Sequence, residues 1–399
     1  MSGVRAVVVE EFGVVPQVRE VPEPRLTADG VLVRVEVTGL CRSDWHGWQG
    51  HDPGIRLPHV PGHEFAGVVV AVGSAVRTCR VGDRITAPFV CACGRCPSCL
   101  AGDQQVCERQ SQPGFTYWGS FAEYVLVDRA DVNVVRLPDE LDFAAAAALG
   151  CRFATAFRAV VAQGRVAAGE WVAVHGCGGV GLSAVMIAAA CGARVVAVDV
   201  AAPALELARR CGAAVCLDAT NLPDVDAGGM GETGRAGGAR DADQTGAAGE
   251  TGAAGGAGAA AGGGGPGRVA AAVRAATGGG AHLSIDALGS NATCVGSIES
   301  LRRRGRHIQV GLLPAAGGRP ALPMELVIAY ELELRGSHGM AAHAYPRLLG
   351  LIAAGALRPG LLVADTLPLD DAPAALATMD GPSAGGIRLI RPGPTTGSG

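Results

Sequence analysis

The stretch that decides the fold is WVAVHGCGGVGLSAVMIAAACGARVVAVD, residues 171–199. It opens with a short apolar run, Trp171–His175, which is typical of a buried strand. A glycine-rich turn follows, and then an apolar segment, Leu182–Ala190, that is predicted to be a helix. A second strand, Arg194–Val198, ends at the acidic residue Asp199. Strand, glycine turn, helix, strand and acid in this order predict a β-α-β unit with parallel strands.

The turn itself has the G-x-G-x-x-G pattern of dinucleotide-binding units. Its first glycine allows the tight turn, its second lets a pyrophosphate approach the backbone, and its third lets helix and strand pack closely. The free N–H groups at the start of the helix would then face the phosphates. The residues expected to contact the dinucleotide are Gly176, Gly178, Gly179, Val180 and Gly181.

Asp199 lies 18 residues after Gly181, where the acid of such units is found. It is expected to accept hydrogen bonds from the adenosine ribose hydroxyls. A carboxylate at this place repels a 2′-phosphate, so the sequence predicts NAD rather than NADP. The alternative is a solvated aspartate at the end of a strand.

Four cysteines stand close together in CGRCPSCLAGDQQVC, residues 93–107. They are separated by two, two and seven residues, and they are Cys93, Cys96, Cys99 and Cys107. Four thiolates close a tetrahedral zinc site with no open position, which predicts a structural zinc ion. The alternative is a disulfide cluster of a secreted domain. It fits poorly with a chain of 399 residues that has 13 cysteines, an odd number, and no recognisable leader.

A second candidate zinc site combines residues that are far apart in the sequence. They are Cys41 in GLCRSDWH, His63 in VPGHEFAG and Cys151 in LGCRFATA. One histidine and two cysteines can hold zinc with its fourth position open to water or substrate, which is a catalytic arrangement. Each residue alone is a weak signal, because a lone cysteine in an apolar context is more often part of the core.

Together these motifs resemble the zinc-dependent alcohol dehydrogenases of the medium-chain dehydrogenase/reductase superfamily. The resemblance covers nearly the whole chain apart from one insert and the tail. It is carried by GLCRSDWH, PGHEFAGVVVAVG, the four-cysteine lobe, VGDRI, LGCRFATA and the glycine turn. It implies an α/β chain with a β-rich GroES-like catalytic domain and a Rossmann domain, whose doubly wound parallel sheet binds the cofactor. It also implies two zinc ions per subunit.

The expected domain bounds combine this resemblance with local patterns. The catalytic domain would comprise residues 1–152 and 337–399, with the zinc lobe at about 91–109, and the cofactor domain residues 153–336. Residues 226–267 are almost all glycine, alanine and small polar residues, so we expect a disordered insert there. The expected elements elsewhere are strands at Val31–Thr38, Phe65–Val72, His282–Asp286 and Arg306–Val310, a helix from Val269, and a frayed tail at Pro392–Gly399.

The resemblance also implies roles for individual side chains. Ser43 would accept the hydroxyl proton of the alcohol. The proton would then pass through the nicotinamide ribose to His46, which would release it to solvent. Asp44 would hold the ring N–H of His63. Glu64 would lie near the zinc ion, either as an occasional ligand or in a salt bridge. Further expected cofactor contacts are Arg42, Ala287, Gly311 and Arg388.

The aromatic residues bear on the substrate. Aromatic residues form 4% of the chain but gather near these motifs, at Trp45, Trp48, Phe115, Tyr117 and Trp118. They predict an apolar pocket for a primary, apolar or aromatic, alcohol or its aldehyde; ordinary packing is the alternative. Other possible activities are a dehydrogenase of formaldehyde-type thiol adducts, a secondary-alcohol dehydrogenase and, in another class, a non-catalytic binding protein.

Charge and composition restrict the partners. The formal net charge is −4 and no basic block is present, so nucleic acid is an unexpected partner. The most apolar stretch, Val180–Val200, contains Arg194 and two glycines, which favours a buried helix and strand over a membrane span. Many cysteines without a leader favour a reducing, cytoplasmic setting. By resemblance, a homodimer or homotetramer is expected.

Overall fold

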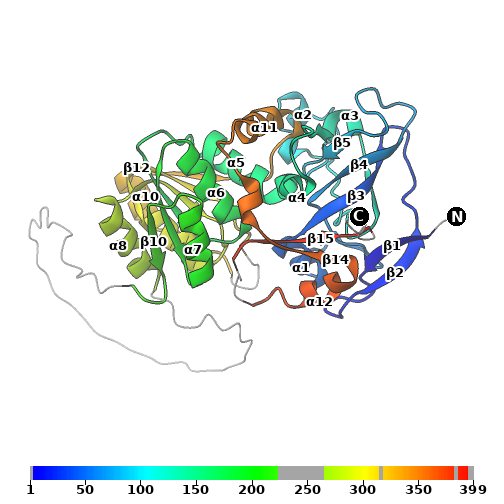
Figure 1. The fold of residues 1–399 in the computed structure, drawn as a ribbon. Helices are drawn as coiled ribbons and strands as arrows, with labels where there is room; N and C mark the ends of the chain where they lie inside the picture. Colours follow the sequence, from blue (N-terminus) through cyan, green and yellow to red (C-terminus); the bar gives the residue numbers. More distant parts are fainter. Residues whose placement is uncertain (1–2, 223–264, 314–317, 382–384, 394–399) are drawn as a thin grey trace, which may run out of the picture.

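The computed structural model describes residues 3–222, 265–313, 318–381 and 385–393. They form two halves, one built from both ends of the chain and the other from its middle (Figure 1). Most of the predicted insert, residues 226–264, and most of the predicted tail, residues 394–399, lie outside the described residues. Among the described helices, none is both long and apolar enough to cross a membrane.

The middle of the chain forms a parallel sheet. Within the described residues its order is β10-β9-β8-β11-β12-β13, and every neighbouring pair is parallel. Counted along the chain this is the order 3-2-1-4-5-6, in which the strand order reverses between β8 and β11 and creates a binding crevice at the carboxyl ends. The strands are β8 (Trp171–His175), β9 (Arg194–Asp199), β10 (Val215–Asp218), β11 (Ala281–Asp286), β12 (Leu301–Gln309) and β13 (Glu333–Gly336).

Helices cover both faces of this sheet (Figure 1). Side chains alternate along β8, so Val172 and Val174 pack with α6 and α7, whereas Trp171 and Ala173 pack with α8 and α9. Burial on both faces explains why β8 reads as a continuous apolar run. The helices are α6 (Gly179–Ala190), α7 (Ala202–Arg210), α8 (Pro266–Thr277), α9 (Asn291–Glu299) and α10 (Met324–Tyr330).

The other half is a mostly antiparallel sheet whose central strand, β3, pairs with β4, β6 and β15. In the described part of the chain its order is β14-β15-β3-β4-β5-β7, so the C-terminal strands join the N-terminal sheet. Its strands are β3 (Val31–Leu40), β4 (Phe65–Val72), β5 (Arg84–Thr86), β6 (Tyr124–Val127), β7 (Val135–Arg136), β14 (Val363–Pro368) and β15 (Ile387–Arg391), and β1 (Gly3–Val8) and β2 (Gln17–Pro22) form a separate hairpin.

Short helices connect these strands and the two halves. A π-helical turn, η2, interrupts the helical segment that leads from the antiparallel sheet to the parallel one. The helices are α1 (Arg42–Trp48), α2 (Pro97–Leu100), α3 (Ala130–Asn133), α4 (Phe143–Ala147), α5 (Ala154–Phe157), α11 (Tyr345–Ala353) and α12 (Ala372–Ala377), with η1 (Gln104–Val106), η2 (Leu149–Phe153), η3 (Arg158–Gln163), η5 (Ala342–Ala344), η6 (Pro359–Leu362) and η7 (Leu369–Asp371).

Most predicted elements are present, with shifted bounds. Helix α6 begins at Gly179 rather than Leu182, because the helix starts within the glycine turn. Strand β12 begins five residues before Arg306, at Leu301. Helix α8 begins at Pro266, inside the predicted insert, so the predicted bound at 267 is wrong by two residues. Proline is favourable at the first position of a helix, because the N–H group that it lacks would have no hydrogen-bond acceptor within the helix.

Candidate active site and metal centres

The structure brings the predicted catalytic ligands together. One ligand atom each of Cys41, His63, Glu64 and Cys151 lie within 4.8 Å of one another. Cys41 follows β3, His63 and Glu64 precede β4, and Cys151 lies in the π-helical turn η2. Such turns are frequent at functional sites because they redirect a side chain from the helix face.

Asp44 fixes the geometry of two of these residues. Its carboxylate accepts a hydrogen bond from the Cys41 backbone N–H (2.9 Å) and another from Nδ1 of His63 (2.9 Å). A third comes from the Gly62 backbone N–H (3.0 Å). Asp44 is itself buried. Asp44 thus lies where the sequence analysis expects it, at the ring N–H of His63. Its hydrogen bond from the Cys41 backbone N–H was not expected from the sequence.

One observation tests whether these residues suit a metal ion. Nε2 of His63 is buried and has no hydrogen-bond partner among the described residues. A buried polar atom without a partner costs about 1–3 kcal/mol, so it requires an explanation. Because Nδ1 is bound by Asp44, Nε2 is left to face the two sulfur atoms. One nitrogen and two sulfurs are ligands that zinc prefers, and the donor set fits zinc.

The Cys41 and Cys151 thiols are close enough to shift each other's pKa. The Cys151 thiol hydrogen-bonds to Cys41, which holds the pKa of Cys41 well below its usual value, and nearby Arg152 and His63 act in the same direction. The same hydrogen bond raises the pKa of Cys151. For His63, burial opposes the charged ring, but the Asp44 carboxylate still raises its pKa. Cys41 is therefore the more acidic of the two thiols.

Glu64 is held in a buried ion pair that the sequence analysis left as one of two alternatives. Its carboxylate accepts hydrogen bonds from the Arg152 backbone N–H (3.0 Å), from Nε of Arg152 (2.9 Å) and from Nη2 of Arg152. Glu64 is 0% exposed and Arg152 is 7% exposed. Its position favours the salt-bridged role over steady ligation of a metal ion.

Arg152 is a residue of the candidate site that the sequence reasoning missed. It follows Cys151 in an otherwise apolar run, and a charged residue there was the available signal. A Cβ at Gly39 would collide with both partners of the ion pair, and a Cβ at Gly179 would collide with Cδ of Arg152. Arg152 therefore lies between the candidate metal site and the glycine turn, and two glycines make room for it.

The four-cysteine lobe is a second compact cluster. The sulfur atoms of Cys93, Cys96, Cys99 and Cys107 lie within 4.8 Å of one another. The Cys107 sulfur accepts hydrogen bonds from the backbone N–H groups of Cys93 and Arg109, both at 3.3 Å. No disulfide forms, since all 13 cysteines lie in the described residues and are free. Backbone donors aimed at sulfur favour thiolates, so this cluster also fits a zinc ion.

The glycine turn lies at the point where the strand order reverses. Gly176 has a φ of +91°, a conformation that side chains rarely allow. A Cβ at Gly181 would collide with the Gly176 carbonyl oxygen, so close packing requires glycine there. A Cβ at Gly178 would meet nothing within 4 Å. Val180 is half-buried in the first turn of α6. The open side at Gly178 leaves space for a pyrophosphate.

Asp199 lies at the end of β9, beside this turn. It accepts hydrogen bonds from the backbone N–H groups of Cys177 (2.5 Å), Val200 (2.8 Å) and Ala201 (2.9 Å). One bond uses Oδ2 and two use Oδ1. A carboxylate has about four acceptor positions, so one position on Oδ2 remains for a ribose hydroxyl.

The other predicted cofactor residues are only partly gathered at this crevice. The Ala287 N–H donates to the His175 carbonyl (2.9 Å), and the Gly311 N–H to the Asp286 carbonyl (2.9 Å), so both lie at the carboxyl ends of the strands. Arg42 instead donates to the Met379 carbonyl. Arg388, in β15, pairs with Asp365 at 3.4 Å.

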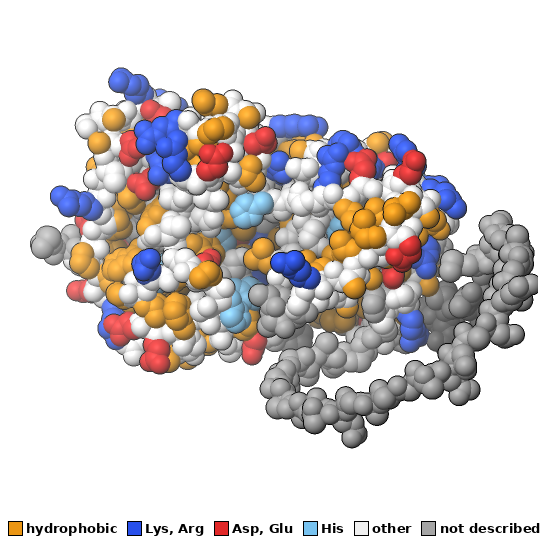
Figure 2. All heavy atoms as spheres, turned by 180° about the vertical axis from the view of Figure 1, so that it is seen from behind, with side chains coloured by type: hydrophobic (Ala, Val, Ile, Leu, Met, Phe, Trp, Pro, Cys, Tyr) orange, Lys and Arg blue, Asp and Glu red, His pale blue; other side chains and the backbone are white. Residues whose placement is uncertain are grey.

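Ser43 and His46 lie in α1, three residues apart and therefore on one helix face. Both are half-buried. Nδ1 of His46 lies 3.0 Å from Nδ1 of His51, a contact that the sequence analysis did not predict. Histidine side chains gather in the middle of the molecular face shown in Figure 2, between the two halves.

The aromatic residues divide into two groups. Phe115 and Phe89 pack against the His63 ring, with ring centroids 5.1 Å and 6.1 Å away. Phe89 was missed, because it follows β5 without a motif of its own. In contrast, Trp48 is buried in the core and donates to the Val14 carbonyl at 2.6 Å. Trp118 donates to the Pro58 carbonyl (3.1 Å), and Tyr117 to the Cys91 sulfur (3.9 Å), so packing explains these three.

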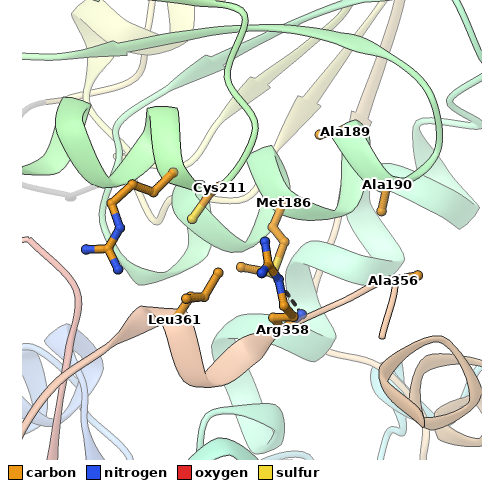
Figure 3. Close-up of a pocket in the computed structure, with 8 residues that line it drawn as sticks. Met186, Ala189, Ala190, Cys211, Ala356, Arg358 and Leu361 are labelled. Carbon is orange, nitrogen blue, oxygen red and sulfur yellow. Dashed lines mark hydrogen bonds between the residues drawn. The ribbon is translucent and has the colours of Figure 1, made fainter. Parts of the chain in front are cut away.

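A surface cavity of about 160 Å³ lies away from these residues, between α6, the end of α7 and residues 356–361 (Figure 3). Met186, Cys211 and Arg358 line it, and the Arg358 backbone N–H donates to the Met186 sulfur at 3.4 Å. None of its lining residues is a predicted zinc ligand or cofactor contact. It is therefore separate from the site that the motifs predict.

Comparison with known proteins identifies the family. Residues 27–139 match the alcohol dehydrogenase GroES-like domain, and residues 256–354 match the zinc-binding dehydrogenase domain. The chain belongs to the zinc-type alcohol dehydrogenases of the medium-chain dehydrogenase/reductase superfamily. The predicted fold class is confirmed by the same matches and by the structural neighbours.

The curated relatives of this zinc-type dehydrogenase match about half of its chain. An alcohol dehydrogenase of Geobacillus stearothermophilus is 43% identical over 212 residues, which are 52% of this chain and 62% of the relative. The chain spans less than two thirds of the length of the curated relatives it matches.

Solved structures are covered almost completely. The alcohol dehydrogenase TADH of Thermus sp. ATN1 is 30% identical with a TM-score of 0.78, and the alignment covers 97% of this chain and 99% of that one. A zinc-binding dehydrogenase of Sinorhizobium meliloti 1021, solved with NADP, is 28% identical with a TM-score of 0.79, at coverages of 98% and 100%.

Proposed function

We propose that this protein is a zinc-dependent alcohol dehydrogenase that transfers hydride between an alcohol and a nicotinamide dinucleotide. The observation that carries the proposal is the cluster of Cys41, His63 and Cys151, in which Nε2 of His63 has no hydrogen-bond partner in the described part of the chain. Arg152, the next residue after Cys151, contacts the glycine turn at Gly179. This contact supports the proposal, because hydride transfer requires the metal site and the dinucleotide site to be adjacent.

Cys41, His63 and Cys151 would hold the catalytic zinc ion, which when bound would act as a Lewis acid on the alcohol oxygen. Asp44 keeps the His63 ring oriented so that Nε2 is available. Ser43 would accept the hydroxyl proton, and His46, one turn further along α1, would receive it on its way to solvent. Cys93, Cys96, Cys99 and Cys107 would hold a second, structural zinc ion.

NAD is the proposed cofactor, with NADP disfavoured. Asp199 has one acceptor position left for a ribose hydroxyl, whereas its negative charge would repel a 2′-phosphate. Gly176, Gly178, Gly179, Val180 and Gly181 would face the pyrophosphate, with Ala287 and Gly311 near the nicotinamide end. Arg42 and Arg388 would reach the phosphates only by leaving Met379 and Asp365.

The proposed substrate is a primary alcohol with an apolar or aromatic group, or its aldehyde. Phe89 and Phe115 support this, because their half-buried rings flank His63. We further propose residues 1–152 and 337–399 as the catalytic domain, residues 153–336 as the cofactor domain, a cytoplasmic location and a homodimer or homotetramer.

Metal analysis and a substrate panel test this function. The purified protein should contain two zinc ions per chain and reduce NAD faster than NADP with benzyl alcohol or a short primary alcohol. Cys41→Ser should abolish turnover, yet the folded variant should still bind NADH. Cys79→Ser is the matched control, since this half-buried thiol belongs to neither cluster. Full activity in a Cys41→Ser variant without its zinc ion would contradict the proposal.

A further inference from the structure

The function proposed so far uses His46 but gives no role to His51, which contacts His46 just beyond the end of α1. Nδ1 of His46 and Nδ1 of His51 are 3.0 Å apart, a hydrogen-bond distance. Both atoms are ring nitrogens, so one must carry a proton and the other must be bare. The contact therefore selects a tautomer for each ring, and it leaves Nε2 of both rings for other partners.

The backbone holds the pair in place. The His51 N–H donates to the His46 carbonyl at 3.0 Å, which turns the chain back after α1. The Trp45 ring packs edge-on against both histidines, with centroids 5.0 Å from His46 and 5.7 Å from His51. One backbone hydrogen bond and two ring contacts therefore hold the two Nδ1 atoms close to each other.

The two rings differ in their access to water. His46 is half-buried and shares a helix face with Ser43, whereas His51 is exposed. With Nδ1 of His46 occupied by His51, only Nε2 of His46 can receive a proton from the site. A proton that leaves His46 through Nδ1 arrives on the exposed ring.

Resting on the proposed dehydrogenase activity, we propose that His51 extends the proton relay and is its outermost member. A proton arrives at Nε2 of His46, and the proton on Nδ1 of His46 passes to Nδ1 of His51. His51 then releases its own Nε2 proton to water. One proton enters, one leaves, and both rings end neutral in the opposite tautomer; the reverse sequence supplies the proton for aldehyde reduction.

The surroundings of His46 favour its neutral ring in the resting state. Burial lowers the pKa of His46, and the positive charges of His51 and Arg42 lower it further, while Cys41 opposes them. Asp52, next to His51, is the nearest carboxylate in the sequence. A relay of neutral rings accepts a proton and passes it on, whereas a permanently charged ring could not accept one.

The test compares His51→Gln with His343→Gln in the full chain. Glutamine keeps a hydrogen-bonding side chain but cannot accept and release a proton. His343 is a matched control, because it is also exposed and makes one side-chain contact, to Gln104 at 3.2 Å. We expect His51→Gln to lower kcat for alcohol oxidation about tenfold at neutral pH in a non-relaying buffer, with the KM for NAD unchanged. Added imidazole should restore the rate, and His343→Gln should behave like the parent.

A second readout needs no bound cofactor or activity. Nitrogen-15 NMR of the histidine rings should show one protonated and one bare Nδ1 in the pair, and the pKa of His46 should rise in His51→Gln but not in His343→Gln. An active parent with unchanged kcat and pH profile in His51→Gln would overturn the relay alone. A parent without any dehydrogenase activity would overturn the proposed function, and the relay with it.

Discussion

Replacing Arg152 by methionine should destabilise the fold strongly. The change leaves Glu64 in place, 0% exposed, without the guanidinium that now neutralises it. Methionine fills most of the volume, so packing loss is small and the unpaired charge dominates. Removing one partner of a buried ion pair costs about 3–5 kcal/mol, which is a large part of the stability of a typical domain.

The pH dependence gives this prediction its sign. Burial already raises the pKa of Glu64, and the Arg152 charge opposes that rise. Without Arg152 the folded carboxyl would keep its proton to higher pH, whereas the unfolded one has a pKa of about 4.3. The loss of stability in Arg152→Met is therefore small when the pH is below the pKa of Glu64 in the unfolded chain. It grows as the pH rises from that value to the pKa of Glu64 in the folded variant, and it is complete at higher pH.

Urea unfolding of the full chain at several pH values measures the effect. Arg152→Met should lose about 3–5 kcal/mol near pH 8 and less at pH 5. Arg158→Met is the control, because the carboxylate that pairs with Arg158, that of Asp103, is exposed and 3.9 Å away, so its loss should cost about 1 kcal/mol or less. The double variant Glu64→Gln/Arg152→Met should recover much of the loss. A loss below about 1 kcal/mol in Arg152→Met, equal at both pH values, would refute the reasoning.

Four further changes test the other parts of the structure. Asp44→Asn removes one acceptor from the contacts to Cys41 and His63 and should weaken zinc binding about 10- to 100-fold, measured by competition with a chelator; unchanged affinity would contradict this. Cys107→Ser should lower the melting temperature more than kcat per folded molecule, because a structural zinc ion contributes to folding; a variant that lacks this zinc yet melts like the parent would disprove it. Asp199→Gly should weaken NAD binding by roughly ten- to a hundredfold and narrow the gap to NADP in a coenzyme titration, and a parent that prefers NADP would show the assignment to be wrong. Burial lowers the pKa of His175 to about 3, so as the pH falls below about 6.5 this residue takes up a proton in the unfolded chain before it does so in the folded one. The free energy of unfolding should therefore drop by about 1.4 kcal/mol per pH unit in this range. Urea unfolding of His175→Gln should show a weaker dependence of stability on pH.

Much of the fold and the candidate site followed from local patterns in the sequence. The unit from Trp171 to Asp199 could be predicted because its turn, helix and strands are encoded by neighbouring residues. The four lobe cysteines lie within 15 residues, so a short loop suffices to bring them together. Cys41, His63 and Cys151 required the family resemblance, because spacing alone cannot tell which distant residues converge.

Only the tertiary structure decided the contacts between distant segments. Glu64 and Arg152 are 88 residues apart, and no periodicity links them, so the choice between ligation and a salt bridge depended on how η2 packs beside β3 and β4. The same holds for Phe89 beside His63, and for Trp48, whose place in the core no motif distinguishes from a pocket. His46 and His51 are close in sequence, yet the turn after α1 determines that their Nδ1 atoms meet. Local spacing encodes elements and short loops, whereas side-chain pairing across elements depends on packing that the whole chain determines.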